Sequence, residues 1–213
     1  MLETYQIKKV SDQFTQEHWD DVPELQLKYF PWDKNGYKPK TTAKIAYNSQ
    51  GIHVYLKSYE KKIRAVCESI NDPVCQDSCM EFFFNPNPEF DDRYMNLEMN
   101  PIGTFLLGLG KDRHSRGQLQ GLSADIFNIK TSVKKEEKDQ YSDDSWSLQY
   151  TIPFSFLEKY YGKLDIKSGM AMKGNVYKCG DNTEYPHYAC WNLVKSDKPD
   201  YHRPESFGQF VLE

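Results

Sequence analysis

The sequence predicts an all-β protein, an antiparallel β-sandwich of jelly-roll or immunoglobulin-like form with one short helix. Short apolar and aromatic runs recur along the 213 residues with turn signals between them, which is typical of sandwiches and barrels. Aromatic residues make up 15% of the chain, among them 15 Tyr and 12 Phe, and wide rings favour the pleated surface of strands. We expect residues 1–213 to form a single domain, because one all-β domain reaches this length and no repeat or linker divides the chain.

Turn residues divide the apolar runs into two predicted hairpins and several further strands. Residues 44–47 and 52–58 are joined by Asn48-Ser49-Gln50-Gly51, and residues 94–100 and 103–109 by Asn100-Pro101-Ile102-Gly103. Further strands are predicted over residues 80–85, 126–133, 146–152, 170–177 and 207–212. One helix is predicted where Ser155 and Glu158 form a capping box and Gly162 ends the turn.

Alternation in two of these strands separates an apolar face from a polar one. In residues 94–100, Asn96 and Glu98 lie on the face opposite the Met and Leu side chains. In residues 80–85 the same alternation places Glu81 on the face opposite Met80, Phe82 and Phe84. If the two strands are neighbours, these three polar groups form a floor flanked by aromatic rings. Such a surface suits a sugar, because hydroxyls need planar donors and acceptors while the C–H face stacks on a ring. An ordinary solvated sheet face is the alternative.

Four stretches resemble, in the right order, segments of the family 9 carbohydrate-binding modules. They are QDSCMEFFFNP (76–86), YMNLEMNPIGTF (94–105), WSLQYTIPFSFL (146–157) and YHRPESFGQFVLE (201–213). Three more are similar to a divergent bacterial branch: FPWD (30–33), NVYKCGD (175–181) and PHYACW (186–191). The resemblance covers residues 29–213. It implies a non-catalytic β-sandwich that binds glucan or xylan chains at a reducing end, often attached to glycoside hydrolases of polysaccharide catabolism, with calcium as structural support.

The resemblance also implies which residues hold the sugar. In the family the sugar lies between two Trp rings and is hydrogen-bonded by a Glu, an Arg and an Asn. The Glu falls on Glu81 and the second Trp on Tyr201. The first Trp falls on Cys75, the Asn on Lys198 and the Arg on Met95. One polar contact and one aromatic ring of the family site therefore remain.

Other side chains are expected to complete the site. Trp191 and Trp32 are each candidates to replace the missing ring, with burial in the core as the alternative for both. Arg203 and His202 follow Tyr201 directly and could donate to hydroxyls or a carboxylate, with a surface salt bridge as the alternative. The predicted sugar-binding residues are Glu81, Tyr201, Asn96, Glu98, Trp191 and Arg203.

Metal ligands are few in the sequence. Asp20-Asp21 and Asp91-Asp92 offer oxygen ligands for the structural calcium, with solvated loop carboxylates as the alternative. Cys75 and Cys79 are four residues apart, but no second pair with metal-ligand spacing follows, which argues against a zinc site. The chain has 5 Cys, an odd number that leaves at least one thiol free within the chain.

The charge and hydropathy of the chain indicate which binding partners to expect and in which cell compartment the protein works. A net charge of −4 gives no basic footprint for nucleic acid, and no apolar run approaches the length of a membrane span. The first ten residues lack the apolar core of a signal peptide. Together with the odd Cys count this favours the cytoplasm, with a secreted or periplasmic form whose signal was removed as the alternative. We expect a carbohydrate ligand and association with a glycoside hydrolase; the sequence does not indicate the oligomeric state.

Three other functions stay open. The sugar site could be degenerate and the chain a structural or interaction module. A glycoside hydrolase needs two carboxyl groups, which Glu81 and Glu98 could supply. A thiol enzyme would need Cys179 or Cys190 within reach of His187.

Overall fold

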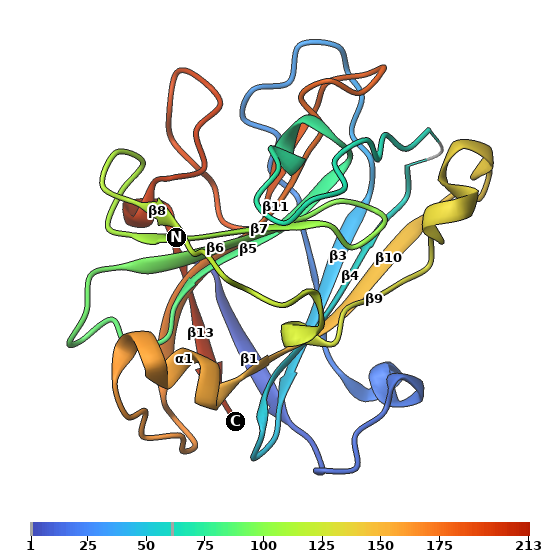
Figure 1. The fold of residues 1–213 in the computed structure, drawn as a ribbon. Helices are drawn as coiled ribbons and strands as arrows, with labels where there is room; N and C mark the ends of the chain where they lie inside the picture. Colours follow the sequence, from blue (N-terminus) through green and yellow to red (C-terminus); the bar gives the residue numbers. More distant parts are fainter. Residues whose placement is uncertain (1, 61) are drawn as a thin grey trace.

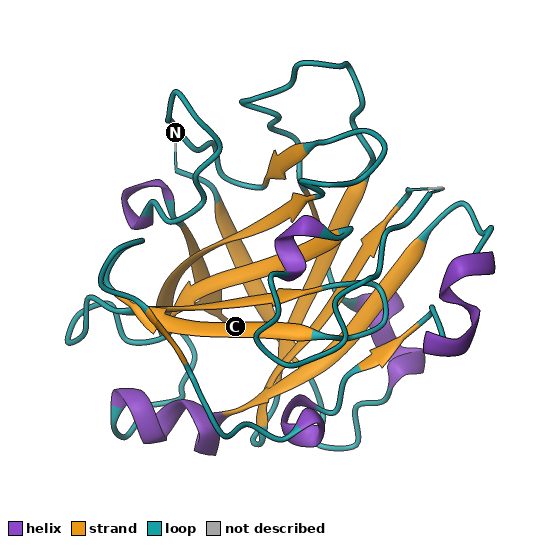
Figure 2. Cartoon of the chain, turned by 45° about the horizontal axis from the view of Figure 1, so that its top comes forward, coloured by secondary structure: helices purple, strands orange, loops and turns teal. Residues whose placement is uncertain are grey.

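The computed structural model describes residues 2–60 and 62–213, and its strands form one 13-stranded sheet that curls into two facing layers (Figures 1 and 2). One layer has the order β8-β7-β6-β5-β11-β13, and the other has the order β3-β4-β10-β9. The first contains β5 (Cys79–Asn85), β6 (Tyr94–Met99), β7 (Phe105–Gly110), β8 (Gly117–Gln118), β11 (Ala171–Cys179), β12 (Tyr188–Cys190) and β13 (Gly208–Leu212). The second contains β2 (Glu24–Gln26), β3 (Thr41–Tyr47), β4 (Gly51–Ser58), β9 (Lys130–Thr131) and β10 (Trp146–Pro153). The predicted all-β sandwich is confirmed.

Strand β1 (Thr4–Lys9) joins the two layers. Its first part, Thr4 to Ile7, pairs in parallel with β13, and Lys8 and Lys9 pair in parallel with the end of β3. Figure 1 shows β1 crossing the molecule beside β13. The sequence analysis did not predict this strand, and its role explains why the two layers form one continuous sheet.

The inner faces of the layers enclose the main hydrophobic core. β5 and β6 pair antiparallel, with Phe82 opposite Leu97, so the predicted neighbourhood of these strands is confirmed. Their apolar faces contribute the predicted side chains to the core, namely Met80, Phe82, Phe84, Met95, Leu97 and Met99.

The outer face of β5 and β6 is buried as well, under a second apolar layer made by loops. Every residue of both strands is buried. Phe83 and Tyr94 on this face pack in one cluster with Trp32, Tyr201 and Phe207 from the loops and the chain's closing segment. The alternative of a solvated sheet face is therefore wrong: the polar outer-face groups Glu81, Asn96 and Glu98 are at most 4% exposed.

Two local predictions were wrong. Helix α1 (Phe154–Tyr161) begins directly after Pro153 without a side-chain cap, so Ser155 lies inside the helix and the carboxylate of Glu158 accepts a hydrogen bond from the Leu164 backbone N–H instead. Gly162 ends the helix as predicted, with φ at 73°. In place of the strand predicted over 126–133, residues Ala124–Phe127 form a 3-10 helix and only Lys130–Thr131 pair with β10.

The remaining helical segments are short 3-10 turns. They are η1 (Gln16–Asp21), η2 (Val74–Gln76), η4 (Lys135–Gln140) and η5 (Pro204–Ser206). None of the helices in the described part of the chain is long and apolar enough to cross a membrane.

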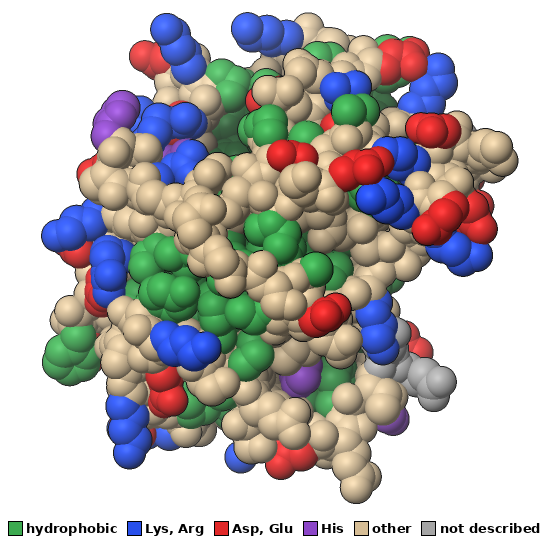
Figure 3. All heavy atoms as spheres, viewed as in Figure 1, with side chains coloured by type: hydrophobic (Ala, Val, Ile, Leu, Met, Phe, Trp, Pro, Cys, Tyr) green, Lys and Arg blue, Asp and Glu red, His purple; other side chains and the backbone are tan. Residues whose placement is uncertain are grey.

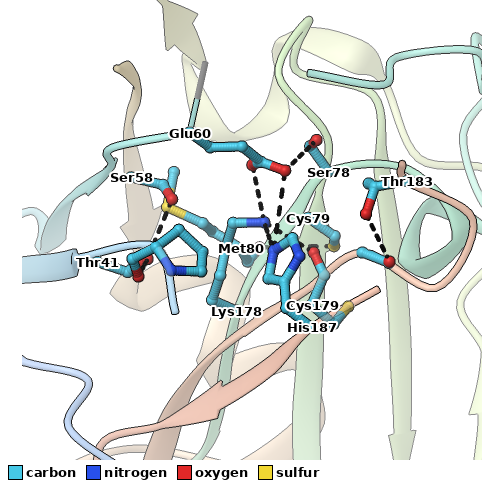
Figure 4. A network of polar contacts seen from close by, with 12 residues as sticks. Thr41, Ser58, Glu60, Ser78, Cys79, Met80, Lys178, Cys179, Thr183 and His187 are labelled. Carbon is cyan, nitrogen blue, oxygen red and sulfur yellow. Dashed lines mark hydrogen bonds and ion pairs between the residues drawn. The ribbon is translucent and has the colours of Figure 1, made fainter. Parts of the chain in front are cut away.

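A buried ion pair connects the two layers at one end of the core (Figure 4). Lys178 of β11 places its Nζ 2.9 Å from a carboxylate oxygen of Glu60, just beyond β4, and neither side chain is more than 2% exposed. Trp146 Nε1 and Ser78 Oγ also donate to Glu60, at 3.0 and 2.9 Å. Burial is the largest single effect and would raise the pKa of Glu60, but the charge of Lys178 and the hydrogen bonds from Lys178 and Trp146 contribute to a larger opposite shift, so the pKa lies below its usual range.

His187 completes this network as a neutral ring. Its Nε2 lies 2.6 Å from Lys178 Nζ, and its Nδ1 lies 2.8 Å from the carbonyl of Tyr185. Burial, and after it the charge of Lys178, lowers the pKa of His187 to about 4. Nδ1 therefore carries the proton and donates it, and Nε2 accepts from the ammonium group.

We predict that Lys178→Met costs about 3–5 kcal/mol in the free energy of unfolding, because it leaves the Glu60 carboxylate buried without its counter-charge. Urea unfolding of the variant measures this loss. The double variant Glu60→Met/Lys178→Met should lose less than the sum of the single variants. Lys173→Met, at an exposed position of the same strand, is the matched control; equal losses in Lys178→Met and Lys173→Met would contradict the prediction.

Candidate functional site

A cavity of about 420 Å³ lies over the outer face of β5, β6 and β11. The loop between β7 and β8, the loop after β11 and the segment before β13 form its walls. Its lining includes three of the predicted site residues, Glu81, Glu98 and Tyr201. Lys and Arg side chains gather around the loops of residues 111–116 and 195–203, at the upper left of Figure 3.

Two carboxylates form the floor of the cavity. Glu81 of β5 and Glu98 of β6 are direct cross-strand partners and are only 2% and 4% exposed. The Cys179 thiol donates to Glu81 Oε1 at 3.0 Å, and the Asn96 amide donates to Glu98 Oε1 at 3.0 Å. The predicted polar floor of Glu81, Asn96 and Glu98 is thus brought together, with Asn96 beneath the cavity as the support of Glu98.

Burial shifts the protonation of both carboxyl groups. Burial, followed by the charge of Glu98, raises the pKa of Glu81 well above its ordinary value. Burial also raises the pKa of Glu98 to about 7, although Arg116 partly offsets it. Two acids that interact this closely titrate as a pair. At neutral pH the floor therefore offers both a hydrogen-bond donor and acceptors.

Glycines of β7 make room for this arrangement. In the run Leu107-Gly108-Leu109-Gly110 the leucines face the core and the glycines face the cavity side. A Cβ on Gly108 would lie 2.4 Å from Asn96 Oδ1, and one on Gly110 would lie 2.3 Å from the Cα of Arg116. Alternating Leu and Gly was the sequence signal for this contact, and the sequence analysis did not use it.

Arg116 reaches the cavity from the β7–β8 loop. Its Nε is buried and has no hydrogen-bond partner among the described residues, and its charge acts on both Glu81 and Glu98. The sequence analysis missed this residue. The family arginine was expected at Met95, but Met95 faces the core, whereas Arg116 lines the cavity from another part of the chain.

Arg203 lies beside the cavity and is paired. Its Nε is 2.8 Å from one oxygen of Asp200, and Arg113 Nη2 is 2.9 Å from the other. Asp200 and Arg113 line the cavity, whereas Arg203 lines the neighbouring hollow together with Lys198. Arg203 therefore positions Asp200 at the rim.

Tyr201 forms the aromatic wall. Its ring stacks on Tyr177 with 4.0 Å between centroids and 11° between planes, and its hydroxyl donates to the carbonyls of Lys178 and Ala189. One face of the ring is therefore covered. Tyr188 also lines the cavity. It is half-buried and hydrogen-bonded to Asp181, and its ring centroid lies 6.5 Å from that of Tyr201. Tyr188 is therefore a second candidate for stacking on a ligand, and it was not predicted from the sequence.

The two tryptophans lie outside the cavity lining. Trp191 packs in the main core, with its ring centroid 4.7 Å from that of Phe210. Trp32 is buried beside Tyr201, and its Nε1 donates to the Ser196 carbonyl at 2.6 Å. Cys75, which takes the place of the family's first Trp, does line the cavity.

The acidic pairs considered for calcium are engaged by basic side chains or stay apart from other ligands. Arg93 Nε contacts both oxygens of Asp91 at 3.0 Å, and Lys111 Nζ lies 2.9 Å from Asp92. Asp20 and Asp21 join no cluster of possible metal ligands among the described residues. Calcium binding stays a prediction from the family.

His187 has no part in a thiol site. Both of its ring nitrogens bond within the ion-pair network, to Lys178 and to the Tyr185 carbonyl. Burial raises the pKa of the Cys190 thiol to about 11. The hydrogen bond with Cys79, and after it burial, raises the pKa of Cys179 well above its ordinary value. A nucleophilic thiolate needs the opposite shift and a nearby base, so the geometry does not favour a thiol enzyme.

Comparisons with known proteins agree with the geometry. A sequence model of carbohydrate-binding family 9 matches residues 14–212. The structure of a "putative carbohydrate-binding protein" from Bacteroides uniformis ATCC 8492 is 27% identical, with a TM-score of 0.84 and 100% coverage of both chains. Two structures of a family 9 module from Caldicellulosiruptor kristjanssonii, in complex with glucose and with cellotriose, are each 13% identical, with TM-scores of 0.62 and 0.61. They cover 99% of this chain and 96% and 94% of theirs. No curated protein matches the chain.

We predict that Glu98 makes the protein less stable as the pH rises from about 4.5 to 7. The pKa of Glu98 is raised in the folded state, so the unfolded chain releases its proton first and binds fewer protons across this interval. Stability is therefore highest below the unfolded pKa and is lost as pH rises through the folded one. Urea unfolding at several pH values measures this slope, and Glu98→Gln should flatten it. An unchanged slope in Glu98→Gln would contradict the raised pKa.

Proposed function

Because the chain belongs to carbohydrate-binding family 9, we propose that its cavity binds a mono- or oligosaccharide of glucan or xylan type without transforming it. The observation that carries the proposal is the buried pair of Glu81 and Glu98, which opens into a cavity walled by Tyr201. Its volume of about 420 Å³ falls in the range of small-ligand pockets. A sugar is the ligand whose hydroxyls match such a floor.

Hydroxyl groups would find both donors and acceptors in the cavity. The ionised member of the carboxyl pair accepts, and the protonated member donates. The Arg116 guanidinium, whose Nε lacks a partner among the described residues, can donate to a ring or hydroxyl oxygen. A bound sugar would thus satisfy polar groups whose burial is costly while they remain unpaired.

Aromatic contact would come from the Tyr201 and Tyr188 rings, which both line the cavity and lie edge to face with 6.5 Å between centroids. Stacking on one such ring contributes roughly 1–3 kcal/mol by analogy with nucleobases, and about 1.4 kcal/mol corresponds to a factor of ten in affinity. With Cys75 in place of a second Trp, we expect weaker binding than a two-ring sandwich provides.

The proposed role is to hold a sugar chain for carbohydrate catabolism, beside a glycoside hydrolase. The complexes of the C. kristjanssonii module with glucose and cellotriose support a sugar ligand, as does the description of the B. uniformis protein as a "putative carbohydrate-binding protein". The family is one of binding modules, which supports the absence of catalysis.

Two observations favour other candidates. A glycoside hydrolase uses two carboxyl groups, one of them with a raised pKa, and here the pKa of Glu98 is raised to about 7. Turnover of aryl glycosides above that of a Glu81→Gln variant would establish this activity. The covered face of Tyr201 and the thiol at Cys75 are compatible with a degenerate site. A folded protein that binds nothing on a glycan array would establish that role instead.

We predict that Arg116→Ala and Tyr201→Ala each weaken sugar binding by at least about tenfold, because they remove a donor and a stacking face. Isothermal titration with glucose, cello-oligosaccharides and xylo-oligosaccharides measures this. Arg116→Ala removes a side chain that forms no ion pair among the described residues, so it should fold even if Tyr201→Ala does not.

Tyr185→Ala is the control, since Tyr185 is 48% exposed and does not line the cavity. Its affinity should equal that of the wild type, and Tyr201→Phe should retain most of the binding. Unchanged affinity in both Arg116→Ala and Tyr201→Ala would refute this placement of the site.

A further inference from the structure

Three metal-ligating side chains meet at the floor of the cavity. The ligand atoms of Cys79, Glu81 and Cys179 all lie within 4.8 Å of one another, and all three residues are buried. Among the described residues no other such group of His, Cys, Asp and Glu occurs. Figure 4 shows Cys79 and Cys179 close together on neighbouring strands.

The sheet itself fixes this arrangement. Cys79 of β5 and Cys179 of β11 are direct antiparallel partners, and Glu81 lies two residues further along β5, hence on the same face. In the sequence, Cys75 and Cys79 have no second pair of ligands at metal-binding spacing, which is why zinc was not expected. Strand pairing instead brings in Cys179 from the other end of the chain, which no local spacing could reveal.

The donor set has a clear chemical preference. Two thiolates and one carboxylate select a borderline or soft divalent ion over calcium or magnesium. Zinc sites with three protein ligands keep a fourth position open to solvent or ligand. Here Glu81 and Cys179 line the cavity while Cys79 lies behind them, so the open position would face the cavity.

We propose that Cys79, Cys179 and Glu81 form a Zn²⁺ site whose fourth position opens into the cavity. Binding forms two Zn–S bonds and one Zn–O bond. It releases to solvent the protons of both thiols and the proton that Glu81 carries when it is the protonated member of the carboxyl pair. It replaces the present hydrogen bond from the Cys179 thiol to Glu81 Oε1. The bound ion with two thiolates and one carboxylate carries a net charge of −1, which the nearby Arg116 guanidinium offsets.

Proton release makes the affinity depend on pH. Because the metal must displace these protons, its affinity rises with pH. A merely adventitious surface ion would not show this dependence on buried thiols.

The test is titration of the reduced, metal-free protein with Zn²⁺ against a competing chelator, with Co²⁺ as a spectroscopic substitute. We expect one ion per chain and a thiolate-to-cobalt charge-transfer band. Cys79→Ser and Cys179→Ser should each lower the Zn²⁺ affinity by more than about 100-fold, beyond the effect of altering an outer-shell residue. Cys190→Ser, at another fully buried thiol outside the cluster, is the matched control and should bind as the wild type does.

Three results would overturn the proposal: no Zn²⁺ binding by the reduced wild type, equal affinity in Cys79→Ser and wild type, or a Co²⁺ spectrum without thiolate bands. Formation of a Cys79–Cys179 disulfide on mild oxidation, with no ion bound by the reduced form, would assign the pair a redox role instead. Thermal unfolding of each variant, compared with Cys190→Ser, separates loss of the ligand from loss of the fold.

Discussion

Glu81 and Glu98 face each other across β5 and β6 beneath loops that keep water away. Two carboxylates cannot both be charged cheaply in such a place, so the protein must share protons between them or supply positive charge. The structure does both. The pKa values of the pair are raised, and Arg116 brings a guanidinium to the rim. The cavity thus has carboxyl groups at its floor, the Arg116 guanidinium at its edge and the Tyr201 ring on its wall. Such a lining suits a polyhydroxylated ligand.

The rest of the fold holds this pair in place. The second apolar layer, which includes Trp32, Tyr177 and Phe207, covers the outer face of the strands and lowers the dielectric around the acids. Gly108 gives Asn96 the space to support Glu98. On β11, successive residues face opposite sides: Lys178 enters the core network with Glu60, and Cys179 donates to Glu81. The carbonyl of Lys178 also accepts the hydroxyl of Tyr201. One strand thus links the core ion pair, the cavity floor and the aromatic wall.

Strand periodicity was sufficient to predict the sandwich and the polar floor. Alternation assigns Asn96 and Glu98 to one face of their strand and Glu81 to one face of its own. That the two strands are neighbours was a condition of the floor, which the structure meets. Periodicity could not show that this face is covered, because the covering residues come from loops with no regular pattern. For the same reason Arg116, which lines the cavity, was missed. Trp191 was considered for the sugar site on nearness in sequence to the closing segment, but it follows a strand that directs it to the core.

The family likeness gives the fold and the class of ligand, and the departures from the family pattern lie within the cavity itself, at Cys75 and Tyr201. The proposed sugar site depends on one property: Glu81 and Glu98 have raised pKa values, and a bound sugar contacts them directly. An NMR pH titration of the Glu98 side-chain carboxyl, with and without saturating sugar, measures this property. We predict a midpoint near 7 in the free protein that falls when sugar hydroxyls donate to the carboxylate. A midpoint at the ordinary value of glutamic acid, unchanged by sugar, would contradict the account.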